Sequence, residues 1–183
     1  MKKTVFASVL VAMALTMGFT SCNKNEDDND SDFIIGDFSP LEVLMVVQNA
    51  DGQNLLDPNT PNNFVGDTII TEWIGKTYAM TDTVPINSGI ARTRVLNAHM
   101  YGLLYVFTDD SIPALCLGNI DGAEHYDDEP ATIHWPDGST DVISITASYK
   151  WSEKKGPHDF VRKFKLNGKV ISEGQNPQIT LIK

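Results

Sequence analysis

The chain has 183 residues, with 14 Lys and Arg against 24 Asp and Glu, which gives a formal net charge of −10. Affinity for nucleic acid depends largely on Lys and Arg side chains that neutralise phosphates, so this balance argues against a nucleic-acid partner. The same balance argues against binding to an anionic membrane through the net charge of the protein.

The first 21 residues have the features of a secretory signal. Met1-Lys2-Lys3 is a short basic start, and residues 5–19 carry no charge. An uncharged stretch of this length matches the apolar region of a signal peptide and is too short for an ordinary transmembrane helix. Thr20 and Ser21 then lead directly into Cys22. We therefore predict that residues 1–21 are a signal peptide.

The expected cleavage region resembles the lipobox of bacterial lipoproteins, in which the cysteine becomes the new N-terminus and carries acyl chains. Ser21 is the small residue expected before the cysteine, and Phe19 stands where Leu is usual, as in the looser lipoboxes of the Bacteroidota. The resemblance implies that Cys22 is the lipid-attachment site. The alternative is an ordinary signal peptide cut near Ser21, which would leave Cys22 unmodified.

The stretch after the cysteine is acidic. Residues 23–32 contain five acids, one Lys and no apolar residue, so they cannot bury a core, and we expect residues 22–32 to form a disordered tether. Lys24 followed by Glu26-Asp27-Asp28 resembles the export signal of Bacteroidota surface lipoproteins. That resemblance implies a lipid-anchored protein of the outer membrane, exposed at the cell surface; the alternative is a protein that faces the periplasm.

The remaining residues, 33–183, have the length of one domain with an adequate core. Cys116 is the only cysteine among them, so they can form no disulfide with one another. Its neighbours Ala114, Leu115 and Leu117 are apolar, which predicts a buried and unreactive thiol.

These residues show the pattern of short strands separated by turns. Residues 41–47 form a continuous apolar run typical of a buried strand. Residues 141–151 alternate strictly, and the apolar face that ends at Trp151 is assigned to the core. Asn167-Gly168 is a strong hairpin signal, and Pro136-Asp137-Gly138 predicts another turn. Further strands are expected at 68–73, 77–80, 90–97, 101–108, 114–117, 131–135, 160–166 and 178–182.

No segment of ten or more residues shows a clean helical period with caps. Regularly spaced strands with these turns predict an all-β fold, a single-domain antiparallel β-sandwich that is Ig-like or a partial barrel.

Four motifs together resemble a group of uncharacterised Bacteroidota cell-envelope lipoproteins. They are DGQNLLDP at 51–58, GNIDG at 118–122, WPDG at 135–138 and RKFKLNG at 162–168. The resemblance spans most of the chain after the signal peptide. The resemblance implies a location in the cell envelope and a β-rich fold. It assigns no functional residues, because the group has no established activity.

Carboxylates are dense between residues 121 and 129, a segment that we interpret as a loop. Like charges on one loop repel each other, and bound Ca²⁺ would relieve this repulsion. The candidate ligands are Asp121, Asp127, Asp128 and Glu129. The alternative is a solvated acidic loop without metal. The four histidines are scattered without the spacing of a zinc site.

Aromatic residues are the candidates for ligand binding. Trp and Tyr rings can stack on the apolar C–H faces of sugars, and Tyr126, in the acidic segment, and Trp135, beside a turn, are the best-placed candidates. The alternative is that strand tryptophans fill the core.

No catalytic residue is predicted. The chain contains no G-x-S-x-G, G-x-G-x-x-G or G-x-x-x-x-G-K-[ST] motif. A Ser-His-Asp triad or a pair of catalytic carboxylates converges only in space, so enzymatic activity stays an open question. We expect a lipid-anchored envelope protein with a non-enzymatic binding role such as glycan capture. The alternatives are a structural or interaction subunit of an envelope complex and, third, a hydrolase.

Overall fold

The computed structural model describes residues 38–81 and 100–183. Residues Ile35–Lys183 form one compact unit. The described residues contain strands and turns and no helix, and hence no helix long and apolar enough to cross a membrane. The signal peptide, Cys22, the tether and the strand expected at 90–97 lie outside the described residues.

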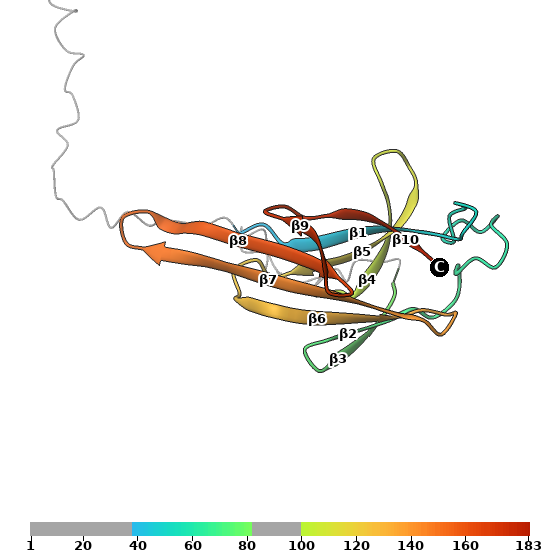
Figure 1. Cartoon of the computed structure of the whole chain (residues 1–183), viewed down its shortest axis with the longest axis horizontal. Coiled ribbons are helices and arrows are strands. Elements are labelled where there is room, and N and C mark those ends of the chain that lie inside the picture. Colours follow the sequence, from blue (N-terminus) through green and yellow to red (C-terminus); the bar gives the residue numbers. More distant parts are fainter. Residues whose placement is uncertain (1–37, 82–99) are drawn as a thin grey trace, which may run out of the picture. The chain divides into compact units, whose positions relative to one another are not determined.

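The described strands form two sheets (Figure 1). A four-stranded sheet has the order β10-β1-β5-β4, and a six-stranded sheet has the order β3-β2-β6-β7-β8-β9. The strands are β1 (Leu41–Gln48), β2 (Ile70–Trp73), β3 (Lys76–Ala79), β4 (Leu103–Phe107), β5 (Pro113–Ile120), β6 (Tyr126–His134), β7 (Thr140–Ser152), β8 (Gly156–Leu166), β9 (Lys169–Glu173) and β10 (Gln178–Ile182). The predicted all-β, sandwich-like single domain is confirmed.

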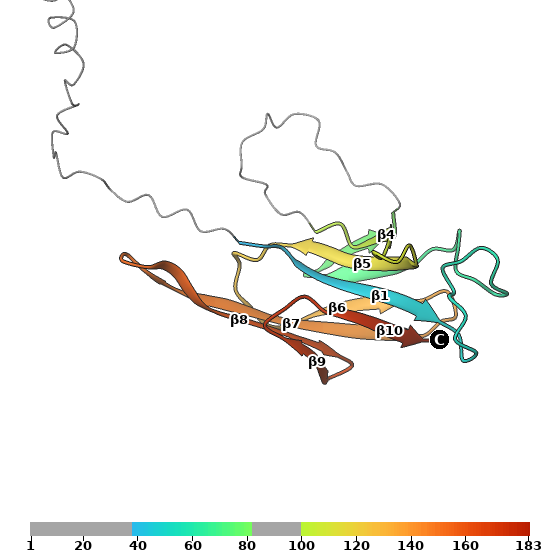
Figure 2. The same ribbon diagram turned by 90° about the horizontal axis from the view of Figure 1, so that it is seen from above.

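The core lies between the two sheets, which Figure 2 shows as stacked layers. On β1, Leu41, Val43 and Met45 are fully buried while the residues between them are half-buried. On β7, Ile143 and Ile145 are fully buried in the same way. This alternation follows from the two-residue period of a strand, which turns successive side chains to opposite faces. Burying one such side chain contributes about 1.5–3 kcal/mol.

Two of the predicted turns are confirmed. Asn167 and Gly168 both have positive φ, 49° and 82°, and join β8 to β9. Gly138, with a φ of 81°, lies in the turn between β6 and β7. Both turns use residues that tolerate the left-handed region.

One strand pair in the otherwise antiparallel sheets is parallel. β1 and β10 run parallel, with Leu44 opposite Gln178 and Gln48 opposite Ile182. Because these two strands come from opposite ends of the folded region, no turn signal links them, and the sequence gives no local indication of their relative direction.

The acidic segment is not one loop, because β6 begins at Tyr126 and pairs with β7 from Tyr126 opposite Ala147 onward. The pairing shifts between Tyr126 and Glu129, and Asp128 has a φ of 56°, as expected for a β-bulge. Three of the acids that were expected in a loop therefore lie on a strand.

β7 and β8 extend beyond their neighbours. β6 pairs with β7 only as far as Ala147, and β9 pairs with β8 only as far as Lys163. Residues 148–152 and 156–161 therefore form a two-stranded hairpin, here called the arm, which projects from the sandwich (Figure 1).

The assignment of Trp151 to the core is wrong. The alternation along β7 places Trp151 on the same face as Ile145 and Ala147, but its side chain is 57% exposed. Trp151 therefore lies on the predicted face of β7. Its side chain is exposed because the arm extends beyond the end of the opposing sheet.

Candidate functional site

The turn between β2 and β3 has an unusual residue in its first position. Ile74 and Gly75 have φ values of 47° and 69°, so both lie in the left-handed region that a two-residue type I′ hairpin requires. A β-branched residue rarely adopts this conformation, because its Cβ approaches the backbone too closely. The Ile74 side chain is also 56% exposed. The turn therefore presents a strained, apolar side chain to solvent.

Beside this turn lies a hollow of about 450 Å³, here called the aromatic cleft. The β2–β3 hairpin supplies one wall, and the other residues come from the chain before β4, the end of β5 and the start of β6. The Trp73 and Tyr126 rings pack with their centroids 5.5 Å apart and their planes at 58°. The lining residues are Trp73, Ile74, Lys76, Tyr78, Met100, Ile120, Asp121 and Tyr126.

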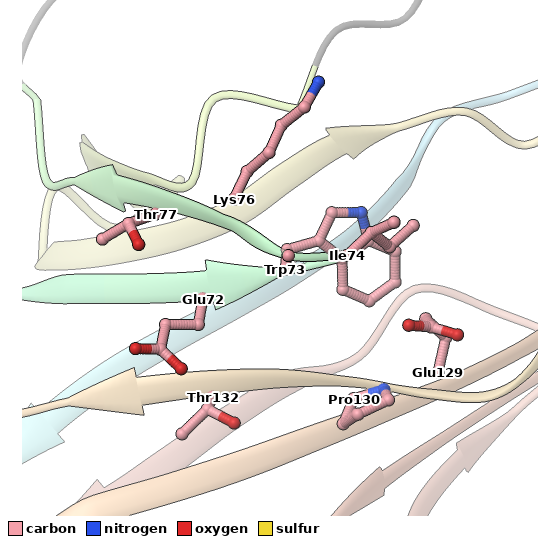
Figure 3. Close-up of a pocket in the computed structure, with 9 residues that line it drawn as sticks. Glu72, Trp73, Ile74, Lys76, Thr77, Glu129, Pro130 and Thr132 are labelled. Atoms are coloured by element: carbon pink, nitrogen blue, oxygen red, sulfur yellow. The ribbon is translucent and has the colours of Figure 1, made fainter.

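A second hollow of about 430 Å³, here called the outer groove, shares Trp73, Ile74 and Lys76 with the aromatic cleft. In Figure 3 the Glu129 carboxylate extends toward the Trp73 and Ile74 side chains, while the Lys76 side chain points away from them. Glu72 also lines this groove. The β2–β3 turn thus separates two neighbouring hollows that both contain carboxylates.

The hydroxyl of Tyr126 is held in its neutral form. Burial, together with the negative charges of Asp121, Glu124 and Glu129, raises the pKa of Tyr126 to about 12. A tyrosine hydroxyl is already protonated at neutral pH, and the raised pKa extends this state to higher pH, so Tyr126 can donate a hydrogen bond. The cleft lining contains one carboxylate, Asp121, and one ammonium group, Lys76, so its formal charges cancel and both groups can form hydrogen bonds with hydroxyls. The aromatic cleft is suited to an uncharged ligand that has an apolar face and several hydroxyl groups.

No protein-family model, curated protein or solved structure matches the chain. The function is therefore inferred from the chemistry of the aromatic cleft itself.

The structure places Tyr126 in the cleft but buries Trp135, the other residue expected to bind a ligand. Trp135 is only 4% exposed. Its ring lies 6.1 Å from that of Phe64, and the Lys183 ammonium lies 4.8 Å from its centroid. The protein itself covers this indole, so the expectation that Trp135 offers a stacking face to a sugar is wrong in this structure.

The four candidate calcium ligands are not brought together. Among residues 38–81 and 100–183, no group of three or more His, Cys, Asp or Glu side chains is arranged to hold a metal ion. An Asp121 carboxylate oxygen accepts a 2.8 Å hydrogen bond from the Ala123 amide, and Asp128 pairs with Lys165 at 2.8 Å. Asp127 and Glu129 lie on β6, one on each side of Asp128. The proposed calcium site is therefore not assembled in the described residues, where Asp121 and Asp128 are engaged with other partners.

The described cysteine and histidines lie outside the aromatic cleft. Burial, together with the charge of Glu42, raises the pKa of the Cys116 thiol to about 12, so it is a poor nucleophile. His134 Nε2 lies 3.5 Å from Glu72 Oε1, and His158 Nδ1 lies 2.9 Å from the Gly156 carbonyl oxygen. His125 packs edge-on against Tyr149.

Trp73 was one of the aromatic residues that the sequence offered for stacking on a sugar, whereas sequence reasoning missed Ile74 and Tyr78 as cleft residues. Trp73 and Tyr78 look like ordinary strand residues, and only their neighbours in space give them a role. Ile74-Gly75 did offer a signal, because a β-branched residue before Gly in a two-residue turn is itself unfavourable.

Proposed function

We propose that the protein is a lipid-anchored binding protein of the bacterial cell envelope that captures neutral glycans in the aromatic cleft. The observation that supports this proposal is the meeting of Tyr126, Tyr78 and the Asp121 carboxylate in one hollow. Sugars present apolar C–H faces to aromatic rings and hydroxyl groups to carboxylates. Few, well-placed polar groups in a mainly apolar hollow are typical of small-ligand sites.

The attachment proposed for this protein comes from its sequence. The basic start, the uncharged stretch and Ser21-Cys22 support lipid attachment at Cys22, and the acidic residues that follow support a place at the surface of the outer membrane. Such a protein would hold a glycan close to the membrane without cleaving it.

A glycan-binding measurement tests the proposal. The compact unit starts at Ile35, so a protein of residues 23–183 keeps every contact described here. We expect saturable binding to a neutral polysaccharide by calorimetry and weaker binding to a uronate or sulfated polysaccharide. Tyr126→Ala should weaken binding roughly tenfold, as expected for a buried aromatic contact. Phe107→Ala is the matched control, because Phe107 is 63% exposed on β4 and does not line the cleft.

Two outcomes would contradict glycan capture in this cleft. One is the absence of binding across neutral polysaccharides. The other is an equal loss of affinity in Tyr126→Ala and Phe107→Ala, because such a result would place the binding surface elsewhere.

A second candidate function is that of an interaction subunit in an envelope complex. It is favoured by two edge strands, β9 and β10, which carry exposed apolar side chains. Val170 is 43% exposed and Ile182 is 61% exposed. Edge strands offer unpaired backbone groups to a partner strand, and exposed apolar side chains add contact area. Crosslinking on intact cells, with photoreactive residues at these two positions, tests this function.

A further inference from the structure

The arm exposes an aromatic face that continues the core face of β7. Tyr149 is half-buried, and Trp151 and Phe160 are 57% and 47% exposed. The rings of Tyr149 and Phe160 lie 5.9 Å apart, so they belong to one cluster. A two-stranded hairpin alone in water is only marginally stable, and an exposed aromatic face lowers its solubility. Both properties suit an arm that contacts another surface.

The arm and its turn carry a small positive charge. Between residues 148 and 161, three lysines (Lys150, Lys154 and Lys155) stand against Glu153 and Asp159, whereas the whole chain has a net charge of −10. Lys150 is paired with Asp159 at 3.1 Å. Lys154 and Lys155, which are exposed in the turn of the arm, form no ion pair among the described residues. The net charge of the chain therefore does not describe the charge at the end of the arm.

The chain that leads back to Cys22 starts from the arm. Phe38, the first described residue, packs against Tyr149 at 4.8 Å and against Phe160 at 5.8 Å between ring centroids. Cys22 precedes Phe38 by 16 residues. A fully extended segment of this length reaches roughly 50 Å, so a lipid on Cys22 ties the arm to within that distance of the membrane.

From these observations we propose that the arm inserts its aromatic face into the headgroup region of an anionic phospholipid bilayer. Trp side chains favour the membrane interface, and lysines beside them interact with lipid phosphates. Trp151 lies at the interface, and Lys154 and Lys155 contact phosphates. The inference rests on the proposed attachment at Cys22, which supplies the high local concentration of membrane. A second, reversible contact would fix the orientation of the sandwich above the bilayer.

The fluorescence of Trp151 provides a direct test. Trp73 and Trp135 are only 5% and 4% exposed, so quenching by bilayer lipids reports mainly on Trp151. A protein of residues 22–183 is coupled through the Cys22 thiol to a maleimide lipid in vesicles of phosphatidylethanolamine and phosphatidylglycerol. Cys116 is spared, because its pKa of about 12 leaves almost no thiolate at pH 7. Brominated lipids in the same vesicles quench indoles that reach the bilayer.

We expect strong quenching in the parent protein and almost none in Trp151→Ala. Replacing Lys154 and Lys155 by Gln should lower the affinity of the untethered protein for these vesicles roughly 30-fold. Each lysine near an anionic surface contributes about 1 kcal/mol to the binding free energy, and the two contributions add. Lys169→Gln is the matched charge control, because Lys169 begins β9 at the opposite end of the hairpin. Ile182→Ser is the control for an exposed apolar side chain.

Three results would overturn the proposal. The first is no quenching of Trp151 in the tethered protein. The second is protection of Trp151 from acrylamide without vesicles, because the protein itself would then cover the arm. The third is protection of Trp151 on intact cells without quenching by lipids, which would assign the arm to a protein partner. Because the protein is tethered chemically, this test does not depend on natural lipid attachment. That attachment is tested separately by the mass of the Cys22 peptide isolated from cells, which increases when acyl chains are present.

Discussion

The indole Nε1 of Trp135 donates a 2.8 Å hydrogen bond to Oδ2 of Asp141, across the turn that joins β6 to β7. The Lys183 ammonium donates to the same oxygen, and the Asn167 side-chain amide donates to Oδ1 at 2.7 Å. Asp141 and Lys183 are both nearly buried. One carboxylate therefore joins two hairpin turns and the residue that follows β10.

Asp141→Asn should lower the free energy of unfolding by about 3 kcal/mol, because it leaves the Lys183 ammonium buried without its anion. Urea denaturation measures this loss. Asp110→Asn, in an exposed loop, is the control and should change stability by less than about 0.5 kcal/mol. A similar effect of the two substitutions would contradict the role assigned to Asp141.

The same carboxylate predicts a dependence of stability on pH. Burial alone would raise the pKa of Asp141, but hydrogen bonds from Lys183, Asn167 and Trp135 outweigh burial and hold the pKa below its ordinary value. The unfolded chain, with an Asp pKa of about 3.9, then binds the proton more readily than the folded protein. The contribution is therefore complete above about pH 5 and is lost as the pH falls through the lower, folded-state pKa. Melting temperatures between pH 7 and pH 2 should fall less steeply in Asp141→Asn than in the parent protein.

Ile74→Asn should stabilise the protein by about 1 kcal/mol. Asn tolerates the left-handed conformation that Ile adopts there, with a φ of 47°, at a lower cost. Thermal denaturation measures the gain, and Ile182→Asn, which removes an exposed apolar side chain without relieving a positive φ, serves as the control. If Ile74 contacts the glycan, the same substitution should weaken binding while it raises stability. An unchanged or lower melting temperature would show that the turn is not strained.

Thr71→Val should also stabilise the protein, by about 1 kcal/mol. Thr71 is fully buried, and its hydroxyl has no hydrogen-bond partner in the part of the chain that the structure describes. Val keeps the shape and removes the unpaired polar group. The comparison is with Thr71→Ser, which keeps the hydroxyl, loses a methyl group and should be destabilising. A parent protein more stable than both variants would indicate that the hydroxyl is satisfied.

Cys116 should react with a thiol reagent at pH 8 only when the protein unfolds. Burial is the main cause that raises its pKa to about 12, so the reactive thiolate is scarce in the folded state. Labelling followed by mass spectrometry, with and without urea, checks this expectation. Rapid labelling of the folded protein would contradict it.

Much of the fold could be predicted because its signals are local. The alternation along β7 and the Asn167-Gly168 turn depend on neighbouring residues, and both were predicted correctly. The strand at Gln178–Ile182 was also predicted with its observed bounds. The parallel pairing of β1 with β10 could not be predicted in this way, because it joins residues more than 100 positions apart.

The candidate site was harder to predict, because the burial of a strand side chain depends on which residues of the other sheet or of the loops cover it. Trp151 was placed on the correct face but is exposed, since the other sheet ends before the arm. Trp135 was expected near the surface beside its turn, yet Phe64 and Lys183 cover it. Tyr126 was identified from its acidic surroundings, but the partner rings in its cleft became visible only in three dimensions.

The parallel pairing of β1 with β10 can form only after the C-terminal strand has been synthesised. β1 leaves the ribosome long before Gln178, so one of its edges stays unpaired until nearly the whole folded region has been made. Contacts of such long sequence separation slow folding and leave nascent strands open to aggregation. Until Gln178–Ile182 has been made, this edge of β1 lacks its parallel partner and is open to pairing with other chains.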